Sequence, residues 1–212
     1  MSATVVRAAH VALEGELRAL AERGATNEAA TLALRQAGPE LLRFLVHAHG
    51  SETTGADVFS LLAEDIWRGL PTFRWECSFR TWTYALARRA SARYRRSERA
   101  RGRAIPLSEL GALSELVDEV RTRTLSRLRD ENSAAIDTLK GELDVDERML
   151  LSLRVERELS WAEIAAVLAE EGQAADAAAQ ARLRKRFQLL KERLKRRGRE
   201  LGLVSSRDDG HG

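Results

Sequence analysis

The sequence predicts an all-α protein made of two small helical domains. Only 3 of its 212 residues are proline, and no stretch alternates apolar and polar residues as a half-buried strand does. Apolar residues instead return every three or four positions, which places them on one face of an α-helix. A chain of this length can form two domains, each with a modest core.

The first two helices are expected at residues 4–22 and at about 28–49. Gly24 lies between them and can end the first helix, because glycine adopts the left-handed conformation of a helix end without steric cost. Gly38-Pro39 interrupts the second apolar pattern. Since proline removes one backbone hydrogen bond, this pair predicts a kink or a break.

A third helix is expected to start after Gly55 and to end at Leu70, where Pro71 closes the pattern. Ser78 can cap the start of a fourth helix. On a helical wheel, one side of the fourth helix is expected to join the core and the other to face phosphate groups. The core side is Phe79, Trp82, Leu86 and Ala90, and the phosphate side is Tyr84, Arg88, Arg95 and Arg99.

The stretch 67–103 has an unusual composition. It holds 7 of the chain's 11 aromatic residues, and after residue 80 it carries 8 basic side chains and 1 acidic one. Aromatic faces can stack on unpaired bases and cationic side chains can pair with phosphates, so this stretch favours nucleic-acid binding. The alternative is a core cluster followed by a solvated helix end. Trp67, Phe79 and Trp82 fit that core, whereas Trp75 is the candidate for an exposed functional aromatic.

The helical pattern weakens between residues 102 and 117, which we predict to be the domain boundary. A further helix is expected over about 116–143. The net charge also changes along the chain, from +7 in residues 81–103 to −9 in residues 104–178 and +7 in residues 179–212. Two basic blocks around an acidic middle suggest two contacts with one polyanion, although the acidic stretch could equally shield a basic block.

Two capping boxes precede helices in the second half, Asp144 with Glu147 and Ser160 with Glu163. A long basic helix is then expected from about Asp176. A short helix, a turn and a long basic helix form the layout of a helix-turn-helix, in which the second helix enters the major groove of DNA. A solvated amphipathic helix is the alternative.

Several classes of protein are disfavoured. The single cysteine, Cys77, excludes a disulfide framework and a multi-cysteine zinc site. We find no clustered acidic metal site and no nucleotide-binding glycine loop, so we expect no enzyme, no metal and no cofactor. No apolar run approaches the roughly 20 residues of a membrane span, and the amino terminus lacks the apolar segment of a signal peptide. We therefore expect a soluble cytoplasmic protein that does not bind membranes.

Three runs of residues carry a resemblance to a known family. DVFSLLAEDIWRGLPTF at residues 57–73 and SFRTWTYALARR at residues 78–89 are similar to region 2 of bacterial RNA polymerase sigma factors. LLSLRVERELSWAEIAAVL at residues 150–168 is similar to region 4. The chain thus resembles a sigma factor of the sigma-70 family, of the extracytoplasmic-function (ECF) type, which keeps only these two regions.

The resemblance implies a region 2 helical bundle and a region 4 helix-turn-helix joined by a linker. It implies binding to core RNA polymerase and to promoter DNA, with the first domain helping to melt the minus-10 element and the second binding the minus-35 element. An anti-sigma factor would be a plausible further partner. The implied boundaries are 1–27 for an N-terminal helical extension, 28–99 for the region 2-like domain, 100–117 for the linker, 118–203 for the region 4-like domain and 204–212 for a flexible tail.

The resemblance also implies three sets of binding residues. Polymerase would bind on or over the third helix, at Asp57, Leu61, Leu62, Asp65, Ile66 and Trp67. The minus-10 element would meet Phe73, Arg74, Trp75, Ser78, Tyr84, Arg88, Arg95 and Arg96. The minus-35 element would meet Gln180, Arg182, Arg184, Lys185 and Gln188.

The rival hypothesis is a two-domain helix-turn-helix regulator that binds DNA and never binds core polymerase. Its support is a departure in the third helix, where Ser60 and Leu61 replace the glutamine and glutamate that the family usually has. Such a regulator would be expected to dimerise on a palindromic site.

Overall fold

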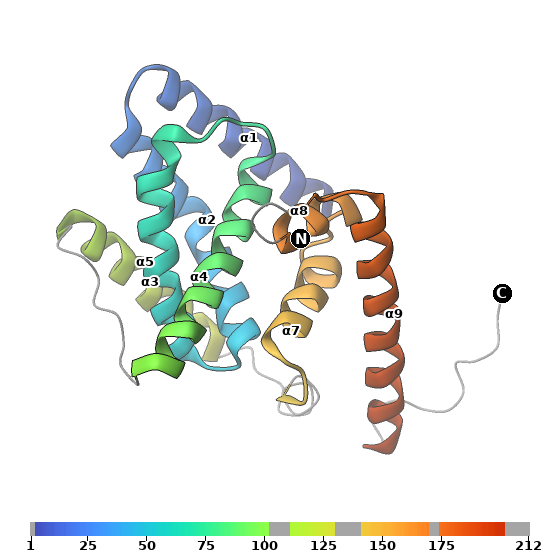
Figure 1. The fold of residues 1–212 in the computed structure, drawn as a ribbon. Helices are drawn as coiled ribbons and strands as arrows, with labels where there is room; N and C mark the ends of the chain where they lie inside the picture. Colours follow the sequence, from blue (N-terminus) through green and yellow to red (C-terminus); the bar gives the residue numbers. More distant parts are fainter. Residues whose placement is uncertain (1–2, 102–110, 130–140, 170–173, 202–212) are drawn as a thin grey trace. The chain divides into compact units, whose positions relative to one another are not determined.

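The computed structural model describes residues 3–101, 111–129, 141–169 and 174–201. Every regular element in these ranges is helical, which confirms the predicted all-α class (Figure 1). The chain divides into two compact units, Met1–Asp130 and Glu131–Gly212. None of the helices in the described ranges is long and apolar enough to cross a membrane.

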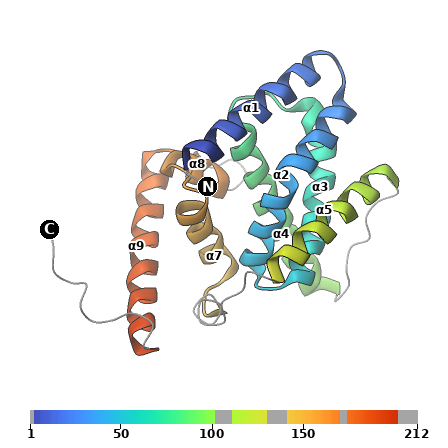
Figure 2. The same ribbon diagram turned by 180° about the vertical axis from the view of Figure 1, so that it is seen from behind.

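The first unit begins with a helical hairpin, α1 (Ala3–Glu22) and α2 (Thr26–His49), which Figures 1 and 2 show from opposite sides. Gly24 in the turn has a φ of 74°, as expected at a helix stop. Of the kink or break predicted at Gly38-Pro39, the break is wrong, because α2 continues through both residues. A Cβ at Gly38 would lie 3.1 Å from Val120 and 3.3 Å from Phe59, so neighbouring helices pack tightly here. That packing offsets the hydrogen bond that proline removes.

The next helix, α3 (Glu52–Gly69), begins earlier than predicted. Ser51 is its cap, since the Oγ of Ser51 accepts a hydrogen bond from the backbone N–H of Thr54 at 3.2 Å. Gly55 lies inside the first turn, where a Cβ would be 2.7 Å from the Cα of Val46. The glycine therefore allows α2 and α3 to cross closely and does not mark a helix start.

A short 3₁₀ turn, η1 (Leu70–Thr72), and the loop 73–78 lead into α4 (Phe79–Arg101). Ser78 caps α4 as predicted, because its Oγ accepts a hydrogen bond from the N–H of Thr81 at 3.1 Å.

The last helix of the first unit is α5 (Gly111–Arg129), which packs against α2 and α3. It does so through a buried stripe made of Leu113, Leu116, Val117, Val120, Thr124 and Leu128. The first unit consequently extends to residue 130, whereas the sequence placed the boundary at 100–117.

The second unit contains α7 (Val145–Leu151), a π-helical turn η2 (Ser152–Glu156), α8 (Trp161–Leu168) and α9 (Ala177–Glu200). Both predicted capping boxes form, at Asp144 with Glu147 and at Ser160 with Glu163. Asp176 caps α9, as the predicted start of that helix requires. Helix α9 packs on α7 and α8 and buries Phe187 and Leu190. The middle of the turn before α9, residues 170–173, and the predicted tail, 204–212, lie outside the described residues.

Candidate nucleic-acid interface

An aromatic cluster (Phe73, Trp75, Phe79 and Trp82) forms where the loop 73–78 meets α4. The rings of Phe73 and Trp82 stack with their centroids 4.6 Å apart, and Phe73 meets Trp75 at 4.7 Å. Phe79 lies 5.8 Å from Trp82. Gly69 makes room for this arrangement, since a Cβ there would be 3.0 Å from the Trp82 ring. Phe79 is buried as predicted, whereas Trp82 is only half-buried.

Trp75 is half-buried and stands in an uncommon backbone conformation. Its φ of 59° is in the left-handed region, which costs a non-glycine residue about 1–2 kcal/mol. The guanidinium carbon of Arg18, on α1, lies 5.0 Å from the centroid of the Trp75 ring and so makes a cation–π contact. The Trp75 ring is therefore held between the aromatic cluster and α1, with part of its surface left accessible.

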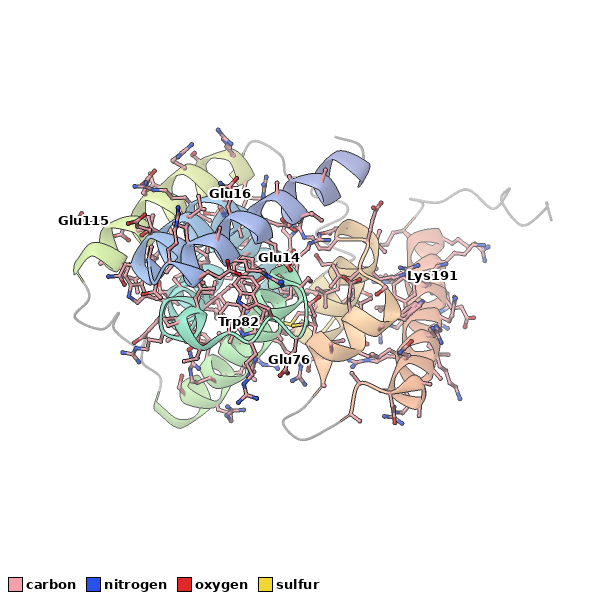
Figure 3. All side chains as sticks on the ribbon, turned by 90° about the horizontal axis from the view of Figure 1, so that it is seen from above. Glu14, Glu16, Glu76, Trp82, Glu115 and Lys191 are labelled. Carbon is pink, nitrogen blue, oxygen red and sulfur yellow. The ribbon has the colours of Figure 1, made fainter. Side chains whose placement is uncertain are left out.

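Helix α1 also caps α4. The carboxylate of Glu14 accepts a hydrogen bond at 2.9 Å from the backbone N–H of Phe79, which lies 65 residues further along the chain. Figure 3 labels Glu14 on α1 and Trp82 on α4 in this part of the first unit. A carboxylate at a helix N-terminus satisfies a backbone donor and meets the positive end of the helix dipole.

The predicted position of Tyr84 on the phosphate-facing side of α4 is wrong. Tyr84 is 1% exposed, and its hydroxyl donates a 2.7 Å hydrogen bond to the Oε1 of Glu40 on α2. Arg80 and His10 reach the same carboxylate, at 3.2 Å and 2.9 Å. The prediction failed because α4 is covered by both α2 and α3, so two sides of the helix are buried rather than one.

The arginines predicted to hold phosphates lie in the middle and the second half of α4. Arg96 is exposed, while Arg88 and Arg95 are half-buried. At 1.5 Å per residue, Arg96 stands about 25 Å along the helix from Phe79, which corresponds to about seven base-pair steps of DNA. The loop residues, including the exposed Arg74 and the half-buried Ser78, are at the other end. A nucleic-acid strand must run along α4 to touch both groups.

Half of the predicted polymerase-binding residues of α3 are buried. Three of the six are buried, namely Leu61, Leu62 and Ile66, and Trp67 is half-buried. Asp65 accepts bonds from the Nη2 of Arg93 at 3.1 and 3.0 Å on its two oxygens, and Asp57 accepts one from the hydroxyl of Tyr94 at 3.4 Å. Burial raises the pKa of Asp65 above its ordinary value, while Arg93 acts in the opposite direction. These two aspartates therefore tie α3 to α4.

The five predicted minus-35 residues lie together on the first half of α9. Its outer face presents Arg182, Arg184, Lys185 and Gln188 to solvent, and Gln180 is half-buried. The Nη2 of Arg184 lies 3.4 Å from the Oε1 of Gln180, and its guanidinium carbon lies 5.8 Å from the Trp161 ring. Trp161 in turn meets Phe187 edge-on at 5.6 Å. The core of this unit thus orients one of the exposed arginines.

The second half of α9 is held to α7 and the residues just before it by ion pairs. Arg193 reaches Glu147 at 2.6 Å, and Arg197 reaches Glu142 at 2.7 Å. The pKa of Arg193 is raised, mainly by its hydrogen bond to Glu147. The arginines at this end of α9 thus form ion pairs within the unit, whereas those in the first half face solvent.

Sequence reasoning missed Glu14, Arg18 and Glu40. The first two are four residues apart on α1 and resemble an ordinary surface ion pair, which they also form at 3.6 Å. Glu40 stands between Pro39 and Leu41 in an apolar stretch, and this isolated acid is the one signal that could have indicated an internal partner.

Comparison with models of protein families, with curated proteins and with solved structures found no match to this chain. The aromatic cluster and the two basic helices are thus the features from which a function can be inferred.

Proposed function

We propose that this chain is a transcription initiation factor of the sigma type, which binds core RNA polymerase and directs it to promoters. The observation that carries the proposal is the two-faced α9. Its inner face buries Phe187 and Leu190, and its outer face exposes Arg184, Lys185 and Gln188. In the major groove, arginine and lysine match guanine edges and glutamine matches adenine. The similarity of residues 150–168 to region 4 gives this helix its expected target, the minus-35 element.

The first unit would act on the minus-10 element. Extruding a base from duplex DNA costs a few kcal/mol, and stacking on an aromatic side chain returns about 1–3 kcal/mol. Trp75 is the member of the aromatic cluster best placed to stack, because it lies in the loop and keeps accessible surface. Arg88, Arg95 and Arg96 would hold the phosphates along α4. Tyr84 supports this surface from inside.

The polymerase would dock on the outer surface of α3. Leu61, Leu62 and Ile66 are buried, so they would shape the docking helix from below rather than touch the partner. The half-buried Trp67 is the predicted residue best able to make direct contact. An anti-sigma factor would inhibit the protein by covering the same surface.

The direct test is co-elution of the full chain with core RNA polymerase on a sizing column, followed by transcription from a genomic fragment library. We expect a stable complex and discrete new start sites. The variant Arg184→Ala/Lys185→Ala is the matched control, since it should co-elute normally yet lose minus-35-dependent start sites. A folded protein that binds DNA but never elutes with polymerase would contradict the proposal.

A second candidate is a DNA-binding regulator that does not bind polymerase. It is favoured by the inward-turned α3, where Asp57 and Asp65 are engaged with Tyr94 and Arg93. Such regulators usually dimerise on two-fold symmetric sites. A symmetric footprint and a dimer in sedimentation would support this candidate, whereas a monomer with an asymmetric two-part footprint would support the first.

A further inference from the structure

The groove between α2 and α5 contains a cluster of arginines that the proposed function does not use. The groove encloses a cavity of about 70 Å³ in the first unit. Four guanidinium groups and one carboxylate line this cavity, so its side chains carry a net positive charge. The lining residues are Arg35, Pro39, Arg43, Glu119, Val120, Arg123, Thr124 and Arg127.

A buried hydroxyl group without a partner marks the floor of this groove. Thr124 is 3% exposed, and its Oγ1 forms no hydrogen bond with any residue that the structure describes. Leaving a buried polar group unsatisfied costs about 1–3 kcal/mol. On the α2 wall, Pro39 brings no backbone N–H. The hydrogen-bond donors at this site are therefore a hydroxyl and four guanidinium groups, set against the one carboxylate of Glu119, and these donors suit a ligand rich in acceptor oxygens.

The positive charge of the groove is only partly compensated. Glu119 lies 3.3 Å from the Nη1 of Arg123 and 4.0 Å from the Nη2 of Arg35. Within the described parts of the chain, neither Arg43 nor Arg127 pairs with an acidic side chain. A single carboxylate thus serves two of the four arginines and leaves the other two available.

We infer that this groove binds one phosphate group as a dianion, from inorganic phosphate or a small phosphomonoester. The cavity of about 70 Å³ has room for a small ligand such as one tetrahedral oxyanion. The planar fork of arginine matches phosphate oxygens with two parallel bonds, and Thr124 can donate one more. A phosphodiester of DNA, flanked by sugars on both sides, fits this enclosed groove less well than a terminal phosphate.

Binding at this site would couple a ligand to the fold. The phosphate would bridge α2 and α5, so it would stabilise the first unit in proportion to its occupancy. Because α5 ends at Arg129, next to the boundary at residue 130, the ligand would fasten the segment from which the chain leaves the first unit. This inference does not depend on the proposed function.

The test is calorimetric titration and thermal unfolding of the full chain with sodium phosphate, against sodium chloride at matched ionic strength. We expect saturable binding and a rise in Tm with phosphate only. O-phosphoserine and duplex DNA are the further probes. Binding of O-phosphoserine at the same site would identify a monoester as a source. Displacement of phosphate by duplex DNA would instead assign the site to the DNA backbone and overturn the inference.

Three variants separate a binding site from a merely solvated arginine surface. Thr124→Val should weaken phosphate binding about tenfold and raise Tm without phosphate, because it removes the unpartnered hydroxyl. Glu119→Gln should tighten binding several-fold, because the carboxylate repels the anion. Arg43→Gln/Arg127→Gln should abolish saturable binding, whereas Arg68→Gln on α3, which pairs with Glu64, should leave it unchanged. Weaker binding by Glu119→Gln, or normal binding by Arg43→Gln/Arg127→Gln, would refute the inference.

Discussion

The two basic helices, α4 and α9, use their arginines in different ways. On α4, Arg93 pairs with Asp65, to which no other described residue donates a hydrogen bond. On α9, Arg193 pairs with Glu147, which already accepts a hydrogen bond from the backbone N–H of Asp144 as part of a capping box. The arginine side chains are almost equally exposed, at 42% and 44%. The two carboxylates differ in the hydrogen bonds that would remain if the arginine were removed. Glu147 would keep the bond from Asp144, whereas Asp65 would keep none from a described residue. We expect this remaining bond to decide how much stability each arginine contributes.

The comparison predicts that the outer charge of α9 serves binding and not folding. Arg184→Ala/Lys185→Ala should weaken binding to promoter DNA by at least about tenfold and relax the preference for the minus-35 sequence. The free energy of unfolding should stay unchanged, because both side chains are exposed. Filter binding over a salt series and urea titration measure the two quantities. Lys195→Ala/Arg196→Ala, with the same charge loss further along α9, is the control, and an equal loss from both variants would contradict a specific role for Arg184 and Lys185.

On α4 we expect the opposite, namely that removing Arg93 changes the stability of the fold. Arg93→Ala should lower the free energy of unfolding by about 1–2 kcal/mol, because it leaves the half-buried carboxylate of Asp65 without its partner. Partial exposure of the pair keeps this figure below that of a fully buried pair. Urea titration at neutral pH measures it, with Arg96→Ala as the control on the same helix. A loss no larger than that of the control would show that α4 does not use this pair for folding.

The pH dependence sharpens the same prediction. Burial raises the pKa of Asp65 above its unfolded value, so the native state holds this proton more tightly than the unfolded state. The group therefore adds stability as the pH falls through the raised pKa, and that contribution is lost as the pH rises. Removing Arg93 should raise the pKa further. The stability deficit of Arg93→Ala should then be smaller at about pH 4.5 than at pH 7, and a constant deficit would contradict the electrostatic coupling of Arg93 to this carboxylate.

Trp75 tests whether the loop beside α4 stores backbone strain. Its φ of 59° favours glycine, so Trp75→Gly should be about 1 kcal/mol more stable than Trp75→Ala. Both variants lose the ring and should slow promoter opening more than the formation of the closed complex. Urea titration and a stopped-flow opening assay measure the two effects. Equal stability of the two variants would show that the backbone at residue 75 is not strained. Equal effects on both kinetic steps would show that Trp75 serves packing and not promoter opening.

The predictions from the sequence succeeded where the determining contacts are local. Asp144, Ser160 and Asp176 cap helices through bonds to residues three positions away, and such spacings are visible in a sequence. Glu14 performs the same task for α4 across 65 residues, and no local pattern indicates that partner. The same limit explains the start of α5, since residues 111–117 were predicted as linker although a helix was expected from about residue 116, and the packing of α5 on α2 is not visible in the sequence.

For the candidate site, too, the sequence predicted correctly what depends on local pattern and failed where a distant partner decides. The exposed face of α9 was predicted correctly, because that helix is covered on one side and its periodicity reports burial directly. Tyr84 was misplaced, because α4 is covered on two sides and Glu40 satisfies the buried hydroxyl. A helical wheel cannot separate a polar residue that faces solvent from one that meets an internal partner.

The smallest expected effect provides the strictest test of the comparison. The Arg193–Glu147 distance, 2.6 Å, is shorter than the 3.0 Å of the Arg93–Asp65 pair, so an argument from distance alone predicts the larger loss on α9. We expect the opposite, a loss of about 0.5 kcal/mol or less for Arg193→Ala, because Glu147 keeps its capping bond to the backbone N–H of Asp144. A double-mutant cycle with Glu147→Gln at low and high salt measures the coupling. If Arg193→Ala lowers the free energy of unfolding as much as Arg93→Ala does, the hydrogen bond that Glu147 retains does not explain the difference between the two helices. The distance within each ion pair would then determine the loss.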